Sequence, residues 1–176
     1  MNRFLIIGFC LIALPLCCGT ALAQGFNQAD RTACAQPLNA GSRAKVIAAC
    51  NALLKTPKLP VIVSGDGYMS RGNAYALVAA DTDKAMSDFN AASTILPKDP
   101  KPLNAAGILL LKQRKLMEAF AVFDAARLLD GRNPTALYGR GLSRLAMGQG
   151  GQKDMDQAMG YDKNIAAFFK ANDLYP

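Results

Sequence analysis

The stretches KAMSDFNAASTILPKDP (residues 84–100) and EAFAVFDAARLLDGRNP (residues 118–134) decide the fold of this chain. When one is laid over the other at an offset of 34 residues, four positions carry the same residue. A fixed offset of this size is typical of stacked helical repeats and has to be tested before single helices are considered. The matching pairs are Ala85 with Ala119, Phe89 with Phe123, Ala92 with Ala126, and Pro100 with Pro134.

Each stretch carries a small, a large and again a small side chain on one helix face. Ala85 and Ala92 are seven residues apart, and Phe89 lies between them, four residues after the first. Residues with this spacing share one face of an α-helix. The pattern therefore predicts that the aromatic ring fills the space between two paired helices.

Glycines recur on the segments that precede these stretches. Gly72, Gly107 and Gly141 follow one another at distances of 35 and 34 residues, which places one extra residue in the turn LVAADTD (77–83). Glycine in a helix interior costs about 1 kcal/mol relative to alanine, so we expect close helix packing at these positions to offset that cost. Asp99 before Pro100 and Asn133 before Pro134 indicate helix starts with a capping residue ahead of the proline.

The segment from about residue 66 to 163 resembles tandem tetratricopeptide repeats of the exported bacterial type. That family's 34-residue helix-turn-helix unit carries Gly, Tyr, Ala, Phe, Ala and Pro at fixed places. The second unit has Leu110 for the tyrosine and Gly131 for the proline, and the third has Met155 for the phenylalanine and a shorter turn, GQGGQ (148–152). The alternative is a bundle with two unrelated amphipathic helices. In the first unit the six residues are Gly72, Tyr75, Ala85, Phe89, Ala92 and Pro97.

The resemblance implies an all-α fold, an α-solenoid of about three tetratricopeptide repeats at 61–98, 99–132 and 133–163. Residues 24–60 are expected to form N-terminal capping helices, one around 28–35 and one over GSRAKVIAACNALLK (41–55), with Ser42 as its cap and Pro57 after its end. Residues 164–176 are expected to form a C-terminal capping helix, with Ile165, Phe168 and Phe169 closing the last repeat. Such caps hide the open ends of a repeat array.

Residues 1–23 have the pattern of a secretory signal peptide. One positive charge precedes an apolar run, and Ala21-Leu22-Ala23 ends it with small residues at the required places. We therefore expect a mature chain that starts at Gln24 and a periplasmic or secreted location. An uncleaved membrane anchor is the alternative. A lipoprotein is a weaker alternative, because it needs a small residue just before the modified cysteine, whereas Leu16 precedes Cys17 and Cys17 precedes Cys18.

Removal of the signal leaves two of the five cysteines, Cys34 and Cys50. An even number in an exported chain suggests a disulfide, and the alternative is two buried free thiols. Neither cysteine belongs to a C-x-x-C motif, so we expect the bridge to have a structural role.

The composition disfavours an enzyme. The sequence has no histidine, and Glu118 is its only glutamate. Catalytic triads that use histidine and histidine-ligated metal sites are therefore excluded, and no cofactor or metal is expected. Without Arg3, nineteen basic residues face thirteen acidic ones, which gives a net charge of +6. Acidic envelope surfaces or acidic proteins suit that charge, whereas no basic run with interleaved aromatics predicts nucleic-acid binding.

The resemblance implies that the chain is a non-catalytic module that docks a peptide or protein partner in a concave groove formed by the first helices. For each predicted groove residue, an ordinary solvated side chain is the alternative. A binder of an anionic small molecule, lipid headgroup or cell-wall polymer is the second reading, through Arg127, Arg132, Arg140 and Arg144 or the turn KQRK (112–115). The sequence leaves the partner, self-association and association with a membrane surface open. The predicted groove residues are Met69, Asn73, Lys101, Asn104, Ile108, Lys112, Tyr138 and Leu142.

Overall fold

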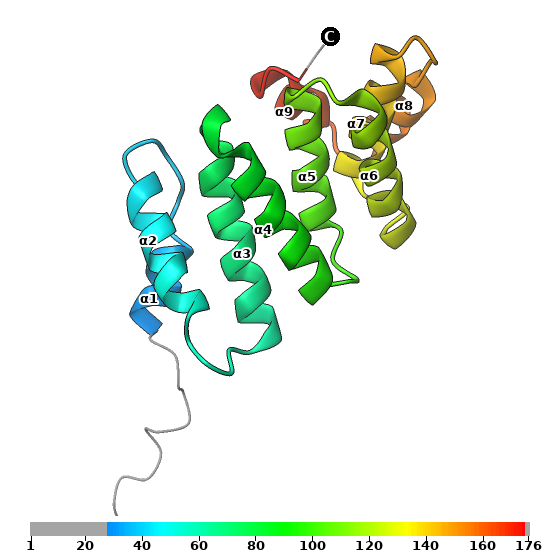
Figure 1. Ribbon diagram of the computed structural model, residues 1–176. Coiled ribbons are helices and arrows are strands. Elements are labelled where there is room, and N and C mark those ends of the chain that lie inside the picture. The colour runs from blue at the N-terminus through cyan, green and yellow to red at the C-terminus, as the bar shows by residue number, and fades with distance from the viewer. Residues whose placement is uncertain (1–27, 175–176) are drawn as a thin grey trace, which may run out of the picture.

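The computed structural model describes residues 28–174, and these residues form α-helices and one 3-10 helix without any strand (Figure 1). The predicted all-α class is confirmed. The expected signal segment and mature start lie outside the described residues. The elements are α1 (Gln28–Cys34), α2 (Arg43–Leu54), α3 (Val61–Ala76), η1 (Ala79–Asp81), α4 (Thr82–Ile95), α5 (Lys101–Lys112), α6 (Leu116–Leu129), α7 (Pro134–Ala146), α8 (Gln152–Tyr161) and α9 (Ile165–Ala171).

The helices pack in two layers. Each helix packs on the next one along the chain, from α1 to α9. The odd-numbered helices α1, α3, α5, α7 and α9 also contact one another in succession, whereas within residues 28–174 the even-numbered helices do not. The odd layer is therefore the more closely spaced side of the molecule.

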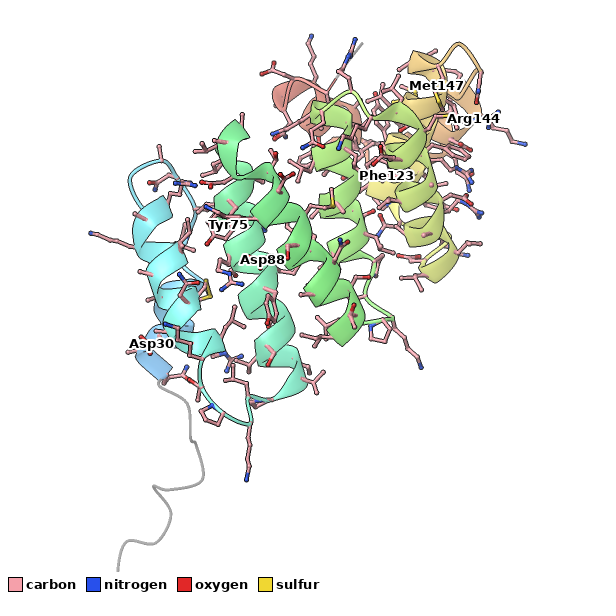
Figure 2. All side chains as sticks on the ribbon, in the orientation of Figure 1. Asp30, Tyr75, Asp88, Phe123, Arg144 and Met147 are labelled. Atoms are coloured by element: carbon pink, nitrogen blue, oxygen red, sulfur yellow. A yellow bond between two sulfur atoms is a disulfide. The ribbon has the colours of Figure 1, made fainter. Side chains whose placement is uncertain are left out.

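Glycines and large side chains meet where paired helices are closest, as their spacing predicted. A Cβ atom on Gly72 would lie 2.7 Å from the ring of Phe89, and one on Gly107 would lie 2.7 Å from the ring of Phe123. Both rings are fully buried, and Figure 2 labels Phe123 among the side chains. In the third pair, Met155 takes the place of the phenylalanine, and a Cβ atom on Gly141 would lie 2.8 Å from its side chain.

Two turns account for the unequal spacing of the helix pairs along the sequence. The extra residue after α3 is taken up by η1, a single 3-10 turn before α4. The short turn before α8 contains glycines, and Gly151 has a φ of 146° and lies directly against the carbonyl group of Gly141. A side chain at Gly151 would find neither the room nor the backbone conformation that it needs.

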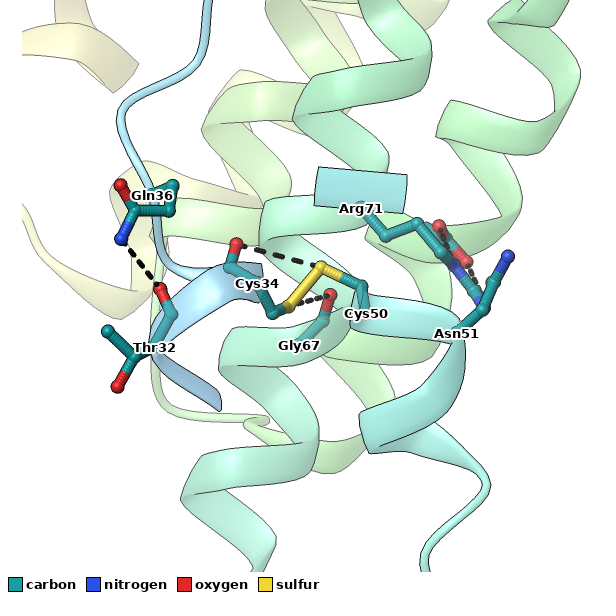
Figure 3. Close-up of a disulfide and its surroundings, with 8 residues drawn as sticks. Thr32, Cys34, Gln36, Cys50, Asn51, Gly67 and Arg71 are labelled. Atoms are coloured by element: carbon teal, nitrogen blue, oxygen red, sulfur yellow. Dashed lines mark hydrogen bonds and ion pairs between the residues drawn. A yellow bond between two sulfur atoms is a disulfide. The ribbon is translucent and has the colours of Figure 1, made fainter. Parts of the chain in front are cut away.

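The N-terminal helices are joined by a disulfide. The sulfur atoms of Cys34 and Cys50 lie 2.07 Å apart, which is a bonding distance, and both cysteines are buried (Figure 3). The sulfur of Cys34 also lies 4.0 Å from the carbonyl oxygen of Gly67 on α3. Val46, Leu53 and Val63 share this cluster, so the bridge sits in a small hydrophobic core of its own.

The C-terminal helix α9 closes the other end. Ile165 and Phe169 are buried, while Phe168 is exposed. The ring of Phe169 lies 4.9 Å from that of Tyr138 and 6.4 Å from that of Phe123, measured between centroids. Leu174 joins the same core.

The predicted caps are only partly found. Asn133 caps α7, since its side-chain oxygen accepts a 2.9 Å hydrogen bond from the amide of Ala136. Helix α5 starts one residue later than expected, at Lys101, whose amide donates to the Asp99 carboxylate. Ser42 precedes α2, but the cap prediction is wrong in detail, because its hydroxyl bonds back to the preceding turn and not to the helix.

Candidate functional site

Five of the predicted groove residues keep exposed surface on the odd layer. Asn73 of α3 and Lys101 and Lys112 of α5 are exposed. Met69 and Ile108 are half-buried, and each packs against a core cluster with part of its side chain. These five residues come from two helices that contact each other, α3 and α5.

Asn104 has a different position from the one predicted. It is only 8 % exposed, and its side-chain NH₂ donates a 3.0 Å hydrogen bond to the side-chain oxygen of Asn133, the cap of α7. Its own side-chain oxygen has no hydrogen-bond partner within residues 28–174. Because Asn104 joins α5 to the start of α7, its first role is to hold two helices together.

Tyr138 and Leu142 do not lie on an open surface, and the expectation that they line a groove is wrong for these two residues. Each is 1 % exposed and belongs to the core that includes Phe169 and Leu174. The physical reason is the position of the C-terminal segment, which packs on the face of α7 that carries both side chains.

Paired charges between helices were missed by the sequence reasoning. Arg71 of α3 makes two hydrogen bonds with Asp88 of α4, of 2.8 and 2.7 Å, and a third with Asn51 of α2, of 2.7 Å (Figure 3). Arg140 of α7 makes the same bidentate pair with Asp154 of α8, at 2.9 and 2.7 Å. Both aspartates are buried.

The two pairs occupy equivalent places in the first and third helix pairs. Each arginine directly precedes the packed glycine, and each aspartate directly precedes the large residue that the glycine meets. In the middle pair the corresponding residues are Ala106 and Val122, which join the hydrophobic core. The sequence signal that could have revealed the pairs is thus the dipeptide Arg-Gly repeated at Arg71 and Arg140.

The arginines are held charged by these contacts. The hydrogen bond with Asp88 raises the pKa of Arg71 above its ordinary value, and it outweighs the opposing effect of burial. Burial lowers the pKa of Arg140, but the hydrogen bonds with Asp154 and Asp124 together raise it by more, so the net shift of this pKa is upward. Such groups serve as fixed charges and cannot exchange protons near neutral pH.

The basic face predicted for the later repeats is largely neutralised. Asp124 accepts a 2.7 Å hydrogen bond from Arg140 and a 3.0 Å bond from Arg127. Arg144 lies 3.9 Å from the carboxylate of Asp154. The contact with Arg140 lowers the pKa of Asp124 below its usual value, with a smaller contribution from Arg127. These arginines therefore bind carboxylates of the protein itself.

Two of the predicted groove residues, Lys112 and Leu142, line one small cavity of about 50 Å³ together with Leu174. A cavity of about 840 Å³ lies between α1 and α2, and Thr32, Gln36 and Lys45 are among its lining residues. In the same part of the chain, no three His, Cys, Asp or Glu side chains are placed to hold a metal ion. No helix there is long and apolar enough to cross a bilayer.

Comparisons with known proteins give no assignment. No protein-family model matches the chain, and a search of curated proteins finds no match.

Proposed function

We propose that the chain is a tetratricopeptide-type repeat protein that docks a peptide or protein partner on its odd layer without chemical reaction. The observation that carries the proposal is the register of close contacts. Gly72 with Phe89, Gly107 with Phe123, and Gly141 with Met155 repeat the same helix-pair contact at nearly constant spacing. Two unrelated helix hairpins have no reason to share this register.

The unequal spacing of the layers supports a concave surface on the odd side. Odd helices contact one another, whereas the described even helices do not. A stack that is tighter on one layer than on the other curves toward the tighter layer. The exposed groove positions of α3 and α5 belong to that layer.

The available surface has donors for a peptide. Asn73 and Lys101 offer amide and ammonium groups, and Met69 and Ile108 offer apolar contact beside them. Side-chain amides and ammonium groups can bind the carbonyl groups of an extended peptide or its carboxylate. Because α9 covers Tyr138 and Leu142, the proposed groove is limited to α3 and α5.

An exported location fits the same proposal. The disulfide between Cys34 and Cys50 would persist in an oxidising compartment and would be rare in a reducing one. Mass spectrometry of the protein recovered from cells would test the location, with an N-terminus at Gln24 and no free thiol as the expected result. A protein that still carries residues 1–23 would favour the membrane anchor instead.

The docking proposal is tested by cross-linking in cell-envelope extracts. We expect the double variant Asn73→Ala with Lys101→Ala to lose a discrete cross-linked partner that the wild-type chain retains. The matched control, Asn90→Ala with Lys98→Ala, removes the same two groups from the exposed surface of α4 and the turn after it. Equal capture by both variants, with helicity unchanged, would contradict docking on the odd layer.

A further inference from the structure

The outer face of α6 is apolar although it is open to solvent. Met117 is 73 % and Leu128 is 72 % exposed, and Ala121 between them is exposed as well. These residues are separated by four and seven positions, so they follow one stripe along the helix. Phe120 lies half-buried at its edge. Residues of this kind usually cover a core, but Met117 and Leu128 belong to none of the core clusters in the described part of the chain.

The neighbouring even helices are polar at the equivalent positions. On α4, at an offset of 34, the residues that correspond to Met117, Ala121 and Leu128 are Asp83, Ser87 and Thr94, all exposed. On α8, at the offset of 32 that aligns Phe123 with Met155, the counterparts of Ala121 and Leu128 are Lys153 and Gly160. The apolar stripe is therefore specific to the middle helix pair and is not required by the packing of the repeats.

Positive charge lies next to the stripe. The turn that leads into α6 contains Lys112, Arg114 and Lys115, which are exposed. None of these three forms an ion pair with an acidic side chain of residues 28–174. Asp124, which lies between Ala121 and Leu128 on α6, is already bound by Arg127 and Arg140. Two acidic side chains near the turn have no ion pair within residues 28–174: Glu118, and Asp173, which lines a small cavity with Lys112 and Arg114. Three basic side chains therefore face two acidic ones here, which leaves an excess of positive charge.

We infer that the outer face of α6, together with the basic turn at 112–115, binds the surface of an anionic lipid bilayer. An exposed apolar helix stripe bordered by unpaired basic residues is the arrangement that lies in a membrane interface, with apolar groups among the acyl chains and cations at the headgroups. A second copy of the chain would bring the same excess of positive charge to the face, whereas anionic headgroups complement it. The inference shares Lys112, the last residue of α5, with the proposed peptide groove, and its experiments change only residues outside that groove.

A single tryptophan tests where the lipid binds. The natural sequence contains no tryptophan, so Leu128→Trp places one fluorescent reporter on the stripe, and Thr94→Trp places it at the equivalent position of α4. Vesicles of phosphatidylcholine with phosphatidylglycerol should shift the emission of the Leu128→Trp protein to shorter wavelength. Pure phosphatidylcholine should not, and the Thr94→Trp protein should not respond to either. This readout reports on the stripe whether or not residues 1–23 remain attached.

A second experiment tests the charge. With the Leu128→Trp reporter, replacing Arg114 by Asn and Lys115 by Gln should raise the lipid concentration needed for the emission shift about thirtyfold at low salt. Asparagine is chosen because Arg114 has a φ of 60°, which asparagine tolerates. The matched control replaces Lys55 and Lys98 by Gln and removes the same charge at exposed sites elsewhere. Added salt should weaken binding of the control far more than that of the Arg114 and Lys115 variant.

Three results would overturn the inference. The first is an unchanged emission of the Leu128→Trp protein with anionic vesicles. The second is an equal shift of the Thr94→Trp protein, which would place the lipid elsewhere. The third is a blue shift that grows with protein concentration in the absence of lipid, together with a doubled mass in light scattering, since that would make a second copy the occupant of the face.

Discussion

Gly107 has no space for even one additional carbon. Its backbone faces the ring of Phe123, and a Cβ atom there would lie 2.7 to 2.9 Å from three ring atoms. Phe123 is fully buried, so the ring cannot move into solvent without opening the core. At the residue scale, the fold thus depends on positions where only glycine leaves enough room for the neighbouring side chain.

The substitution Gly107→Ala tests this directly. We expect it to lower the free energy of unfolding by about 1 to 3 kcal/mol, because overpacking outweighs the better helix propensity of alanine. Gly160→Ala on α8 is the matched control, since apart from its own helix backbone no atom of residues 28–174 lies within 4 Å of a Cβ there, and it should stabilise the protein by about 0.5 to 1 kcal/mol. Urea unfolding of both variants measures the difference, and a stabilised Gly107→Ala protein would falsify the packing account.

These contacts were the part of the fold that the sequence could predict. The spacing of Gly72 and Phe89 is local and repeated, so it predicts both the helix pair and the point of contact. The Arg71–Asp88 pair escaped prediction because a charged residue in an amphipathic pattern is normally assigned to the solvated face. Its repetition at Arg140 and Asp154 was visible in the sequence, but its meaning depends on which helix faces lie together.

At the scale of helix pairs, α3 with α4 and α7 with α8 each contain a buried arginine–aspartate ion pair, whereas α5 with α6 has apolar residues at the same place. Removing Arg71 would leave the Asp88 carboxylate buried without its partner, which costs about 3 kcal/mol or more. The middle pair, with Ala106 and Val122, shows that the same site also accepts apolar residues.

The double variant Arg71→Ala with Asp88→Val should therefore be more stable than Arg71→Ala alone. Replacing a buried ion pair by apolar residues is often neutral, whereas breaking it is strongly destabilising. A double-mutant cycle with the two single variants, measured by urea unfolding, gives the coupling energy. Additive effects of the two single changes would show that the pair contributes little.

Acid should weaken the contact between α6 and α7. The native pKa of Asp124 is lowered by Arg140, so the unfolded chain takes up the proton first as the pH falls. Its contribution is fully present above about pH 4 and is lost at lower pH as the native carboxyl becomes protonated. Since the side chain is 34 % exposed, we expect about 1 kcal/mol or less.

The comparison of wild type with Asp124→Asn measures this contribution. The wild-type protein should be the more stable of the two at pH 6, and the difference should shrink as the pH is lowered to about 3. A difference that stays constant over this range would mean that the charge of Asp124 does not contribute to stability.

The C-terminal helix explains why the predicted site was only partly right. Repeat spacing places Tyr138 and Leu142 at the positions of Met69 and Asn73 in the first pair, and nothing in that spacing says what covers them. Their burial depends on Phe169 and Leu174, which come from the end of the chain. Such a long-range contact is set by the path of the chain after α8, which periodicity does not describe.

At the scale of the whole molecule, the two ends of the helix stack are closed by different means. A disulfide holds the N-terminal end, and an aromatic cluster holds the C-terminal end. Reduction of the bridge, which joins residues 16 positions apart, should lower the free energy of unfolding by about 3 kcal/mol. Urea unfolding with and without reductant tests this, and the Cys34→Ala, Cys50→Ala protein should show no response to reductant.

The separation of the two cores also sets where the molecule opens first. Val46, Leu53 and Val63 belong to a cluster distinct from the one that contains Leu137 and Phe169, so the N-terminal helices can detach without disturbing α7. In reductant, amide hydrogens of α2 would then exchange with solvent through local fraying, while those of α7 would exchange only when the whole chain unfolds. Unfolding would then lose its cooperativity at the N-terminal end alone. The redox state of the surroundings would determine how far local unfolding extends along the helix stack.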